Sequence, residues 1–529
     1  MRKTARWGAL PVGVGLLAAL LAGCGEEESA DAGQGGRIVM GMTDEVLSVD
    51  PASGYDPGSW LVFNNVFQSL LSFPKDGSTP QPEAAEECAF TDSRSQVFRC
   101  TLKDGLKFTS GTPLTSQDVK FSFERTLRIN DPEGPAVMLS TIERIDTPDE
   151  RTVVFHLDRP DATFPQKIAS GAGSIVDSES YPADELRTDG KAVGSGVYRL
   201  DSYGEEEAVF SVNPDYDGPA EVQNSGMTMK FFRGDQAALK KALQNGEVDL
   251  AYRGLAMEDI ADLEAAGGEN GIEVVQGTGA EVHHLVFNMD HPVTGKKGVR
   301  QAVAYLLDRS TLVRDVYRRT AEPLYSIVPA GITGHNTAFF DAYGERPQPQ
   351  KARAALRAEG ITEKVELTLW GTPVRYGPAK IRELEEIAQQ LNASGLFDAD
   401  VKSVELEQYE KDIDAGKYGV YVKGWVPDYP DADNFTAPFF GKDNVLRNGY
   451  EAGRITSELL PRTAGIGDRA ATVEDFEAVQ DAVARDVPFL PVWQGKQYAV
   501  AHEDVSGLEW TLDASTVFRF WEIKKGTEG

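Results

Sequence analysis

Residues 102–125 read Leu102-Lys-Asp-Gly-Leu-Lys-Phe-Thr-Ser-Gly-Thr-Pro-Leu-Thr-Ser-Gln-Asp-Val-Lys-Phe-Ser-Phe-Glu-Arg125, and they contain a strong helix start. Thr115 is followed three residues later by Asp118, which is the spacing of a capping box with Asp in place of Glu or Gln. Apolar residues then recur at helical spacing: Val119, Phe123 and Leu127. The stretch therefore predicts a helix that starts after Thr115 and buries one face.

The sequence around this helix favours short strands. Runs of β-forming residues occur at Gln96–Leu102 and Thr152–Leu157. Short strands mixed with one helix, over roughly residues 80 to 190, indicate a separate α+β domain inserted into the chain.

Two other regions have the pattern of strand–helix–strand units. The first unit comprises a strand at Thr228–Arg233, a helix capped by Asp235 and a strand at Val248–Tyr252. The second comprises strands at Val365–Trp370, Val401–Leu406 and Tyr418–Gly424, with a helix over Ile381–Leu391 and a short helix over Tyr409–Ala415. This alternation predicts parallel or mixed sheets that are covered by helices.

Length and charge limit the class of protein. A chain of 529 residues is expected to form two to four domains. Hydrophobic residues make up 41% and charged residues 26%, which is a globular balance. The net charge is −30, from 53 basic and 83 acidic residues. Such a surface repels phosphates, so nucleic acid is excluded as a partner.

The N-terminus has the pattern of an export signal. Arg2, Lys3 and Arg6 form a basic region before the uncharged stretch 7–22. Leu21-Ala22-Gly23-Cys24 resembles the bacterial lipobox, which implies cleavage before Cys24 and lipid attachment to its sulfur. The alternative is an ordinary secretory signal with an incidental cysteine. We therefore predict a signal peptide at 1–23 and an acidic, glycine-rich tether at 24–36. The mature protein is expected at the outer face of the cell membrane, held by lipid.

The two remaining cysteines flank a segment with the pattern of a hairpin. Cys88 and Cys100 lie on either side of a polar turn with β-forming residues around it. An exported compartment permits a disulfide, which we expect here. Two free buried thiols are the alternative. A zinc site is not expected, because no Cys or His cluster lies nearby.

The usual catalytic motifs are missing from the sequence. It contains no His-Glu-x-x-His helix, no Gly-x-Ser-x-Gly elbow and no Walker phosphate loop. His283 and His284 are adjacent in an expected strand, 282–288, so their side chains point to opposite faces and cannot share a metal. We predict structural roles for both histidines, no catalytic residues and no cofactor.

Three aspartates close together raise the possibility of a calcium site. Asp428, Asp431 and Asp433 have the right chemistry, but their spacing is not that of an EF-hand, and Pro430 interrupts the loop. We predict no metal here, and we expect Asp431 to be a turn residue.

The segment 102–125 strongly resembles the signature region of family 5 solute-binding proteins, the peptide- and nickel-type extracytoplasmic receptors of ABC importers. Further landmarks follow in the family's order: Val49-Asp-Pro51, Asn64–Leu71, Gly194-Ser-Gly-Val-Tyr198, Asn213-Pro-Asp-Tyr-Asp-Gly218, Phe287-Asn288, Val299–Arg309 and Gly424-Trp-Val-Pro-Asp-Tyr-Pro-Asp-Ala-Asp-Asn-Phe435. The resemblance extends over about residues 38 to 525.

This resemblance implies an α/β fold of the periplasmic-binding-protein type (class II, cluster C). Two lobes of mixed sheets with covering helices would close about a hinge, and an α+β domain would be inserted. The implied domains are I (37–77, 194–285 and 502–529), II (78–193) and III (286–501). Ligand would be held between domains I and III.

One segment stands out as a ligand site. Residues 425–431 follow an expected strand, and ligands bind beyond the carboxyl ends of strands in open α/β sheets. In peptide-binding relatives, the acid of the matching Trp-x-x-Asp pattern pairs with the peptide α-ammonium, and the tryptophan lines a side-chain pocket. These residues are Asp428 and Trp425 here. The alternatives are a solvated loop acid and a core tryptophan.

Two further residues complete the candidate set. Tyr429 lies in the same segment as Asp428. Tyr55, at the start of the stretch 55–60, is a candidate for the opposing wall from domain I.

The expected function is that of a monomeric, lipid-anchored receptor that captures dipeptides or oligopeptides. It would deliver them to an ABC permease driven by cytoplasmic ATPases. Alternatives within the class are a metal chelate, such as nickel with a metallophore, or an oligosaccharide. Outside the class, the alternatives are an extracytoplasmic hydrolase and a sensing or adhesion lipoprotein.

Overall fold

The computed structural model describes residues 35–526, apart from 76, 269–270, 373–377 and 442–443. The expected signal peptide, Cys24 and the tether up to residue 34 lie outside the described residues. From Gly35 onward the described residues form one compact unit, so the division into three domains stays a prediction. In the described residues, no helix is both long enough and apolar enough to cross a membrane.

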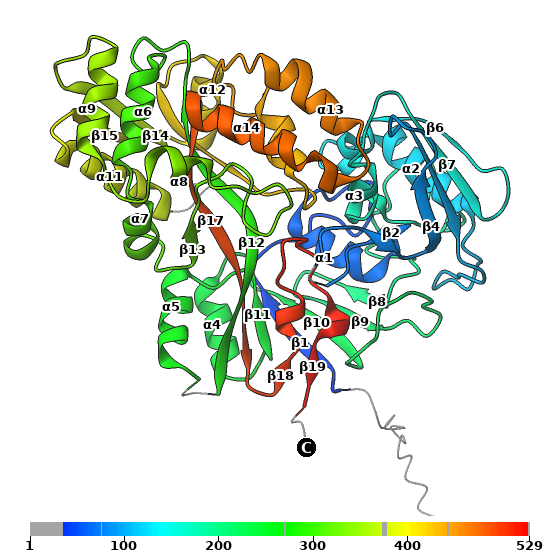
Figure 1. Cartoon of the computed structure of the whole chain (residues 1–529). Helices are drawn as coiled ribbons and strands as arrows, with labels where there is room; N and C mark the ends of the chain where they lie inside the picture. Colours follow the sequence, from blue (N-terminus) through cyan, green and yellow to red (C-terminus); the bar gives the residue numbers. More distant parts are fainter. Residues whose placement is uncertain (1–34, 76, 269–270, 373–377, 442–443, 527–529) are drawn as a thin grey trace, which may run out of the picture. The chain divides into compact units, whose positions relative to one another are not determined.

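The main sheet joins most of the strands, as the α/β prediction requires (Figure 1). Its strands are, in spatial order, β15 (Phe397–Ser403), β14 (Val365–Gly371), β16 (Val420–Trp425), β12 (Ile272–Phe287), β17 (Phe489–His502), β11 (Leu250–Tyr252), β1 (Ile38–Met42), β10 (Gly226–Phe231), β9 (Glu207–Val212) and β8 (Tyr198–Tyr203). A further strand, β13 (Ala321–Pro323), pairs with β17. Parallel and antiparallel pairs both occur, so the sheet is mixed.

Strands β12 and β17 connect the two halves of this sheet. They run side by side from the region of β14 and β16 to the region of β1 and β11 (Figure 1). Their pairing shifts register between Thr278 and Val282, where three residues go unpaired, and again between His283 and His284. At the break, an added Cβ on Gly277 would lie 1.9 Å from the Leu512 carbonyl oxygen, so only glycine fits there.

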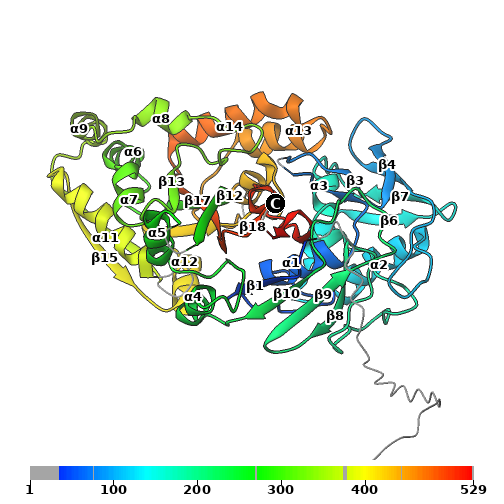
Figure 2. The same ribbon diagram turned by 90° about the horizontal axis from the view of Figure 1, so that it is seen from below.

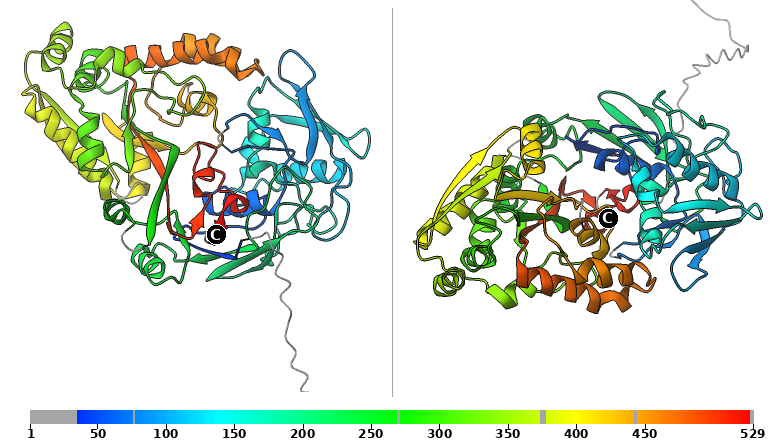
Figure 3. Two further views of the ribbon diagram at one scale, coloured as in Figure 1. Left: turned by 60° about the horizontal axis from the view of Figure 1, so that its bottom comes forward. Right: turned by 90° about the horizontal axis from the view of Figure 1, so that it is seen from above.

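The α-helices pack on the main sheet, on a smaller sheet and on one another. They are α1 (Pro57–Val66), α2 (Ser116–Ile129), α3 (Phe164–Ile168), α4 (Gln236–Gln244), α5 (Met257–Ala266), α6 (Lys297–Leu306), α7 (Arg309–Asp315), α8 (Ala338–Tyr343), α9 (Pro349–Ala358), α11 (Pro378–Ala393), α12 (Leu406–Asp414), α13 (Leu460–Ala464) and α14 (Val473–Asp486). Helix α4 packs on β1 and β11, and α5 packs on β12 (Figure 2). Helices α6 and α9 pack together, and α11 packs on β14 and β15 (Figure 3).

Both predicted strand–helix–strand units are present. Asp235 caps α4, and its carboxylate accepts from the Ala238 N–H at 2.9 Å. Most predicted boundaries differ from the observed ones by one to three residues. The largest difference is in the second unit, where the strand predicted at Val401–Leu406 is β15, Phe397–Ser403. Its buried positions are Phe397 and Ala399, and Leu406 already belongs to α12.

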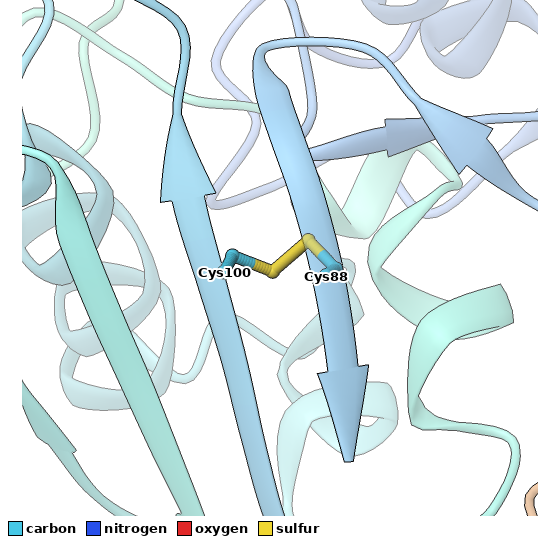
Figure 4. Close-up of a disulfide and its surroundings, with 2 residues drawn as sticks. All are labelled: Cys88 and Cys100. Carbon is cyan, nitrogen blue, oxygen red and sulfur yellow. A yellow bond between two sulfur atoms is a disulfide. The ribbon is translucent and has the colours of Figure 1, made fainter. Parts of the chain in front are cut away.

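The helix predicted from the opening stretch is α2. Thr115 and Asp118 form the reciprocal capping box, and the Thr115 N–H donates to Asp118 Oδ2 at 2.9 Å. This helix packs on a four-stranded antiparallel sheet of β4 (Ala85–Phe90), β5 (Val97–Leu102), β7 (Thr152–Leu157) and β6 (Ile142–Asp146). A disulfide joins Cys88 on β4 to Cys100 on β5, directly across the pair (Figure 4).

Two short antiparallel pairs complete the strands. They are β2 (Leu71–Ser72) with β3 (Gln81–Pro82), and β18 (Val505–Ser506) with β19 (Lys524–Lys525). The buried apolar residues form separate cores around the two halves of the main sheet and inside the small sheet. Tyr429 and Val517, from later parts of the chain, join the core of the small sheet, and Tyr429 places the segment after β16 against it.

Candidate functional site

The candidate segment starts where strand β16 ends. Trp425 is the last residue of β16, and it lies opposite Val282 of β12. Pro427 has no N–H and cannot continue the ladder. A short 3-10 helix, η3 (Ala432–Phe435), then starts at Asp431, which accepts from the Asp433 N–H at 2.8 Å. Asp428 is therefore held in an irregular segment beyond the carboxyl end of a strand.

A single buried side chain, Asn434, fixes this segment. Its Oδ1 accepts from the Trp425 indole N–H at 2.9 Å and from the Asp428 backbone N–H at 3.1 Å. Its Nδ2 donates to Asp428 Oδ2 at 3.1 Å. The Trp425 ring is partly buried and meets Phe439 edge to face, with 5.5 Å between centroids. The two predicted residues Trp425 and Asp428 are thus held by one amide.

Tyr55 reaches Asp428 from a distant part of the chain. It follows strand β1 and precedes α1, and its hydroxyl donates a hydrogen bond to Asp428 Oδ1. The ring lies beside Trp60, at 5.6 Å between centroids, and the side chain is 36% exposed. The structure therefore brings together three of the predicted residues, Tyr55, Trp425 and Asp428.

The carboxyl group of Asp428 is in an unfavourable electrostatic environment. Burial raises its pKa above the ordinary value, while hydrogen bonds from Tyr55 and Asn434 and the charge of Lys167 act in the opposite direction. Burial and the Asp428 charge also raise the pKa of Tyr55, so its hydroxyl stays protonated and donates. Across residues 35–526, outside the gaps, no basic group forms an ion pair with Asp428 within 4.0 Å. A positive charge from outside the chain would be stabilised here.

Tyr429 has different surroundings from Asp428. It is 6% exposed and lies in the core of the small sheet. Its hydroxyl donates to Asp433 Oδ2 at 3.2 Å, and Lys167 Nζ lies 5.8 Å from its ring centroid. These contacts anchor the segment, and a ligand contact by Tyr429 stays a prediction.

The other two aspartates hold the turn. Arg469 forms two hydrogen bonds to Asp431, both at 2.8 Å. Burial and the Asp431 charge raise the pKa of Asp433 to about 6. Among the described residues, no three or more His, Cys, Asp or Glu side chains lie close enough together to hold a metal ion.

A cavity of about 290 Å³ lies beside this segment. Val426 lines it, together with Glu281 of β12 and two residues just beyond strand ends, Asp44 after β1 and Arg253 after β11. Arg253 Nε donates to Asp44 Oδ2 at 2.5 Å. A larger cavity, of about 860 Å³, lies between β2–β3 and the C-terminal segment. None of the predicted residues Tyr55, Trp425, Asp428 and Tyr429 lines either cavity.

The sequence reasoning missed Asp44, Arg253, Glu281 and Asn434. The strand-end rule, applied to the predicted strand 248–252, would have indicated Arg253. Asn434 lies inside the quoted motif, but nothing in the spacing shows that it bonds to Trp425.

The two adjacent histidines are both in the core. His283 stacks on Trp493 at 4.0 Å between centroids, and its Nε2 lies 2.8 Å from Glu281 Oε1. His284 packs against Phe439 and Phe489, and burial lowers its pKa to about 3. Neutral, packed rings of this kind fit the structural roles that were predicted.

The architecture is thus a mixed α/β sheet crossed by two long strands, β12 and β17, with the carboxylate of Asp428 partly enclosed beyond the end of β16. The sequence model for bacterial extracellular solute-binding proteins, family 5 (Middle), matches residues 79–446, and the chain belongs to this family. It is thus a solute-binding protein of an ABC importer and not an enzyme, as predicted.

Known relatives extend over nearly the whole chain. The chain is 24% identical to the probable D,D-dipeptide-binding periplasmic protein DdpA of Escherichia coli, over 92% of this chain and 94% of that protein. It is 25% identical to a dipeptide-binding protein of Pseudomonas aeruginosa, over 94% and 96%. Among solved structures, the unliganded open form of MppA, a periplasmic murein tripeptide-binding protein, matches with a TM-score of 0.81 at 19% identity, over 94% and 99%. This last likeness confirms the predicted fold.

Proposed function

We propose that this protein captures di- or oligopeptides through their free α-ammonium group and delivers them to a membrane permease. The observation that carries the proposal is the environment of Asp428. Two neutral donors, Tyr55 and Asn434, hold its carboxylate, and burial raises its pKa. An ammonium supplies the missing positive charge through a charge-assisted hydrogen bond.

The surroundings suit a peptide in two further ways. Trp425 presents a partly buried aromatic ring beside the carboxylate. The adjacent cavity contains both signs of charge, from Asp44, Arg253 and Glu281. Arg253, which also pairs with Asp44, offers a partner for the carboxylate of a zwitterionic peptide, and Asp428 offers one for its ammonium. The names of the two relatives, both dipeptide-binding proteins, support the same ligand class.

We also propose how the receptor is placed. Lipid on Cys24 would hold the monomeric protein at the outer face of the cell membrane, next to the permease and its cytoplasmic ATPases. The lipobox resemblance supports the anchor, and β12 and β17 would form the hinge between the lobes. The break in their pairing at Thr278 and Val282 supports that position.

Native mass spectrometry of residues 25–529, purified without denaturation, tests the ligand. Release of a noncovalent peptide supports the proposal and gives the peptide's length. Release of a metal chelate or an oligosaccharide would agree with the transport role and would contradict the proposal that Asp428 binds an α-ammonium group. Empty protein is then titrated calorimetrically with unblocked di-, tri- and tetrapeptides, and failure to bind any of them contradicts the proposal. Cleavage of the added peptide would indicate a hydrolase instead.

A further inference from the structure

We infer that Asn434 is the positioning residue of this site, because it fixes both the carboxylate of Asp428 and the indole of Trp425. The inference rests on the proposed function. It adds a residue that itself stays out of reach of the ligand, since Asn434 is only 3% exposed. Any effect of Asn434 on binding must therefore pass through the residues that it holds.

The hydrogen bonds leave one orientation for the amide. The indole N–H of Trp425 and the backbone N–H of Asp428 are both obligate donors, at 2.9 and 3.1 Å from the same atom of Asn434. That atom must be the carbonyl oxygen, so the NH2 group faces Asp428 Oδ2, at 3.1 Å. All three bonds are satisfied in this orientation, and a flip of the amide would break all three.

This arrangement fixes the plane of the Asp428 carboxylate. Oδ2 is held by Asn434, and Oδ1 is held by Tyr55. Each oxygen then keeps a lone pair for a ligand, since a carboxylate has about four acceptor positions. A carboxylate that is held in place before binding loses less entropy when an ammonium arrives.

The same amide links two parts of the ligand site. Trp425 is the proposed wall of a side-chain pocket, and Asp428 is the proposed ammonium partner. Because both depend on one acceptor oxygen, they cannot shift independently. Without Asn434, the Asp428 N–H and the indole N–H would both lose their acceptor, and the segment between β16 and η3 would loosen.

The test is a double-mutant cycle between Asn434→Ala and Asp428→Asn. The probes are Ala-Leu and N-acetyl-Ala-Leu, measured by isothermal titration calorimetry. In the wild-type background, Asn434→Ala should weaken Ala-Leu binding about tenfold. In the Asp428→Asn background the same change should have a clearly smaller effect, because only the part that acts through Trp425 remains.

A matched control separates positioning from general stability. Asn448 is as buried as Asn434, at 1% exposed, and its amide donates to the Pro488 carbonyl, away from the ligand segment. Asn448→Ala should destabilise the protein to a similar extent and leave Ala-Leu affinity unchanged. If the Asn434→Ala protein does not fold, Asn434→Ser is used instead. The short serine hydroxyl cannot make all three hydrogen bonds that the Asn434 amide makes.

A second readout needs no ligand. In tryptophan-labelled protein, the indole N–H resonance of Trp425, assigned with Trp425→Phe, should shift in Asn434→Ala and not in Asn448→Ala. In Asn434→Ala the pKa of Asp428 should rise further, because its ionised form has lost one hydrogen-bond donor.

The outcomes are distinct. Equal loss of Ala-Leu binding in both backgrounds, or an equal loss for the N-acetylated probe, overturns the positioning role even when peptide binding itself is intact. If the wild type binds no peptide, the proposed function fails. The inference about Asn434 is then tested without ligand: if neither the Trp425 indole resonance nor the pKa of Asp428 changes in Asn434→Ala, the inference is overturned.

Discussion

The buried ion pair between Asp50 and Arg125 gives the most direct test of how this fold is held together. It connects helix α2 with the loop that precedes Tyr55, and the side chains of Asp50 and Arg125 are 0% and 1% exposed. Two parallel hydrogen bonds connect them, at 2.6 and 2.7 Å. The change to make is Asp50→Asn, which keeps the shape of the side chain and removes its charge.

The expected cost follows from what Arg125 would lose. Its remaining contacts are the carbonyl oxygens of Pro182 and Glu185, at 2.6 and 2.7 Å, and the Tyr181 ring, at 5.3 Å to the centroid. None of these groups carries a full charge. Removing one member of a buried pair leaves an uncompensated charge, and this typically costs about 3–5 kcal/mol. Exposed pairs contribute about 0–1 kcal/mol, so the burial of this pair determines the magnitude.

Urea unfolding measures the effect, followed by tryptophan fluorescence and by circular dichroism. Two probes are needed because a chain with several cores need not unfold in one step. Arg125→Met serves as the second variant, and the double variant completes the cycle. The double variant should lose at least about 2 kcal/mol less than the sum of the single variants, because it has no unpaired buried charge.

Two results would contradict this reasoning. A loss below about 1 kcal/mol in Asp50→Asn would mean that the guanidinium finds solvent or another partner. Strictly additive losses would mean that the two residues stabilise the fold separately. Peptide affinity should also fall in Asp50→Asn, because Tyr55 lies in the same loop and donates to Asp428.

Three further predictions concern charge and covalent structure. Asp428→Asn should weaken the binding of an unblocked dipeptide by about 10- to 100-fold and leave the binding of its N-acetyl form unchanged, as measured by calorimetry. Dipeptide binding by the wild type should also weaken as the pH falls through the raised pKa of Asp428, because the protonated carboxyl carries no charge. The pKa of Asp433 is raised to about 6, so between about pH 4 and 6 the folded state holds a proton that the unfolded state has lost. The free energy of unfolding should therefore fall as the pH rises through this window. Asp433→Asn should flatten this pH dependence, as measured by urea unfolding at several pH values. Replacing Cys88 and Cys100 by serine should cost about 3 kcal/mol, because a short loop is released, and an unchanged unfolding midpoint would contradict the disulfide's role.

Local patterns in the sequence predicted local structure well. The capping box at Thr115 and Asp118 formed as expected, because both partners lie within one helical turn. Strand β15 was misplaced because Val401 and Val404 favour β-structure by composition. Pairing with β14 instead starts at Phe397, opposite Val365, where burial of the aromatic ring decides the register.

Long-range features could not be predicted in the same way. Strand β12 is 16 residues long, while only its end was expected, because Gly277 and Gly279 weaken the strand pattern. Those glycines are explained only by the backbone that approaches them, and that approach is a property of the fold. Tyr55 and Asp428 are 373 residues apart in sequence, so their hydrogen bond followed from no spacing; family resemblance alone suggested that they face the same site.

The distribution of charge around the site explains why Asp428 in particular is suited to a cationic ligand. Four carboxylates gather near this segment, and the described chain supplies two basic side chains to them. Lys167 pairs with Asp161 at 2.7 Å, and Arg469 pairs with Asp431.

Asp433 is left without an ion pair in the part of the chain that the structure describes. Its pKa of about 6 lets it hold a proton in mildly acidic solution, and Tyr429 donates a hydrogen bond to it. Asp428 has only the neutral donors Tyr55 and Asn434. Burying a carboxylate without a cation is unfavourable, so a ligand that brings an ammonium gains the free energy that a fixed lysine would otherwise have supplied. A lysine engineered beside Asp428 should for that reason stabilise the empty receptor and abolish its affinity for unblocked peptides.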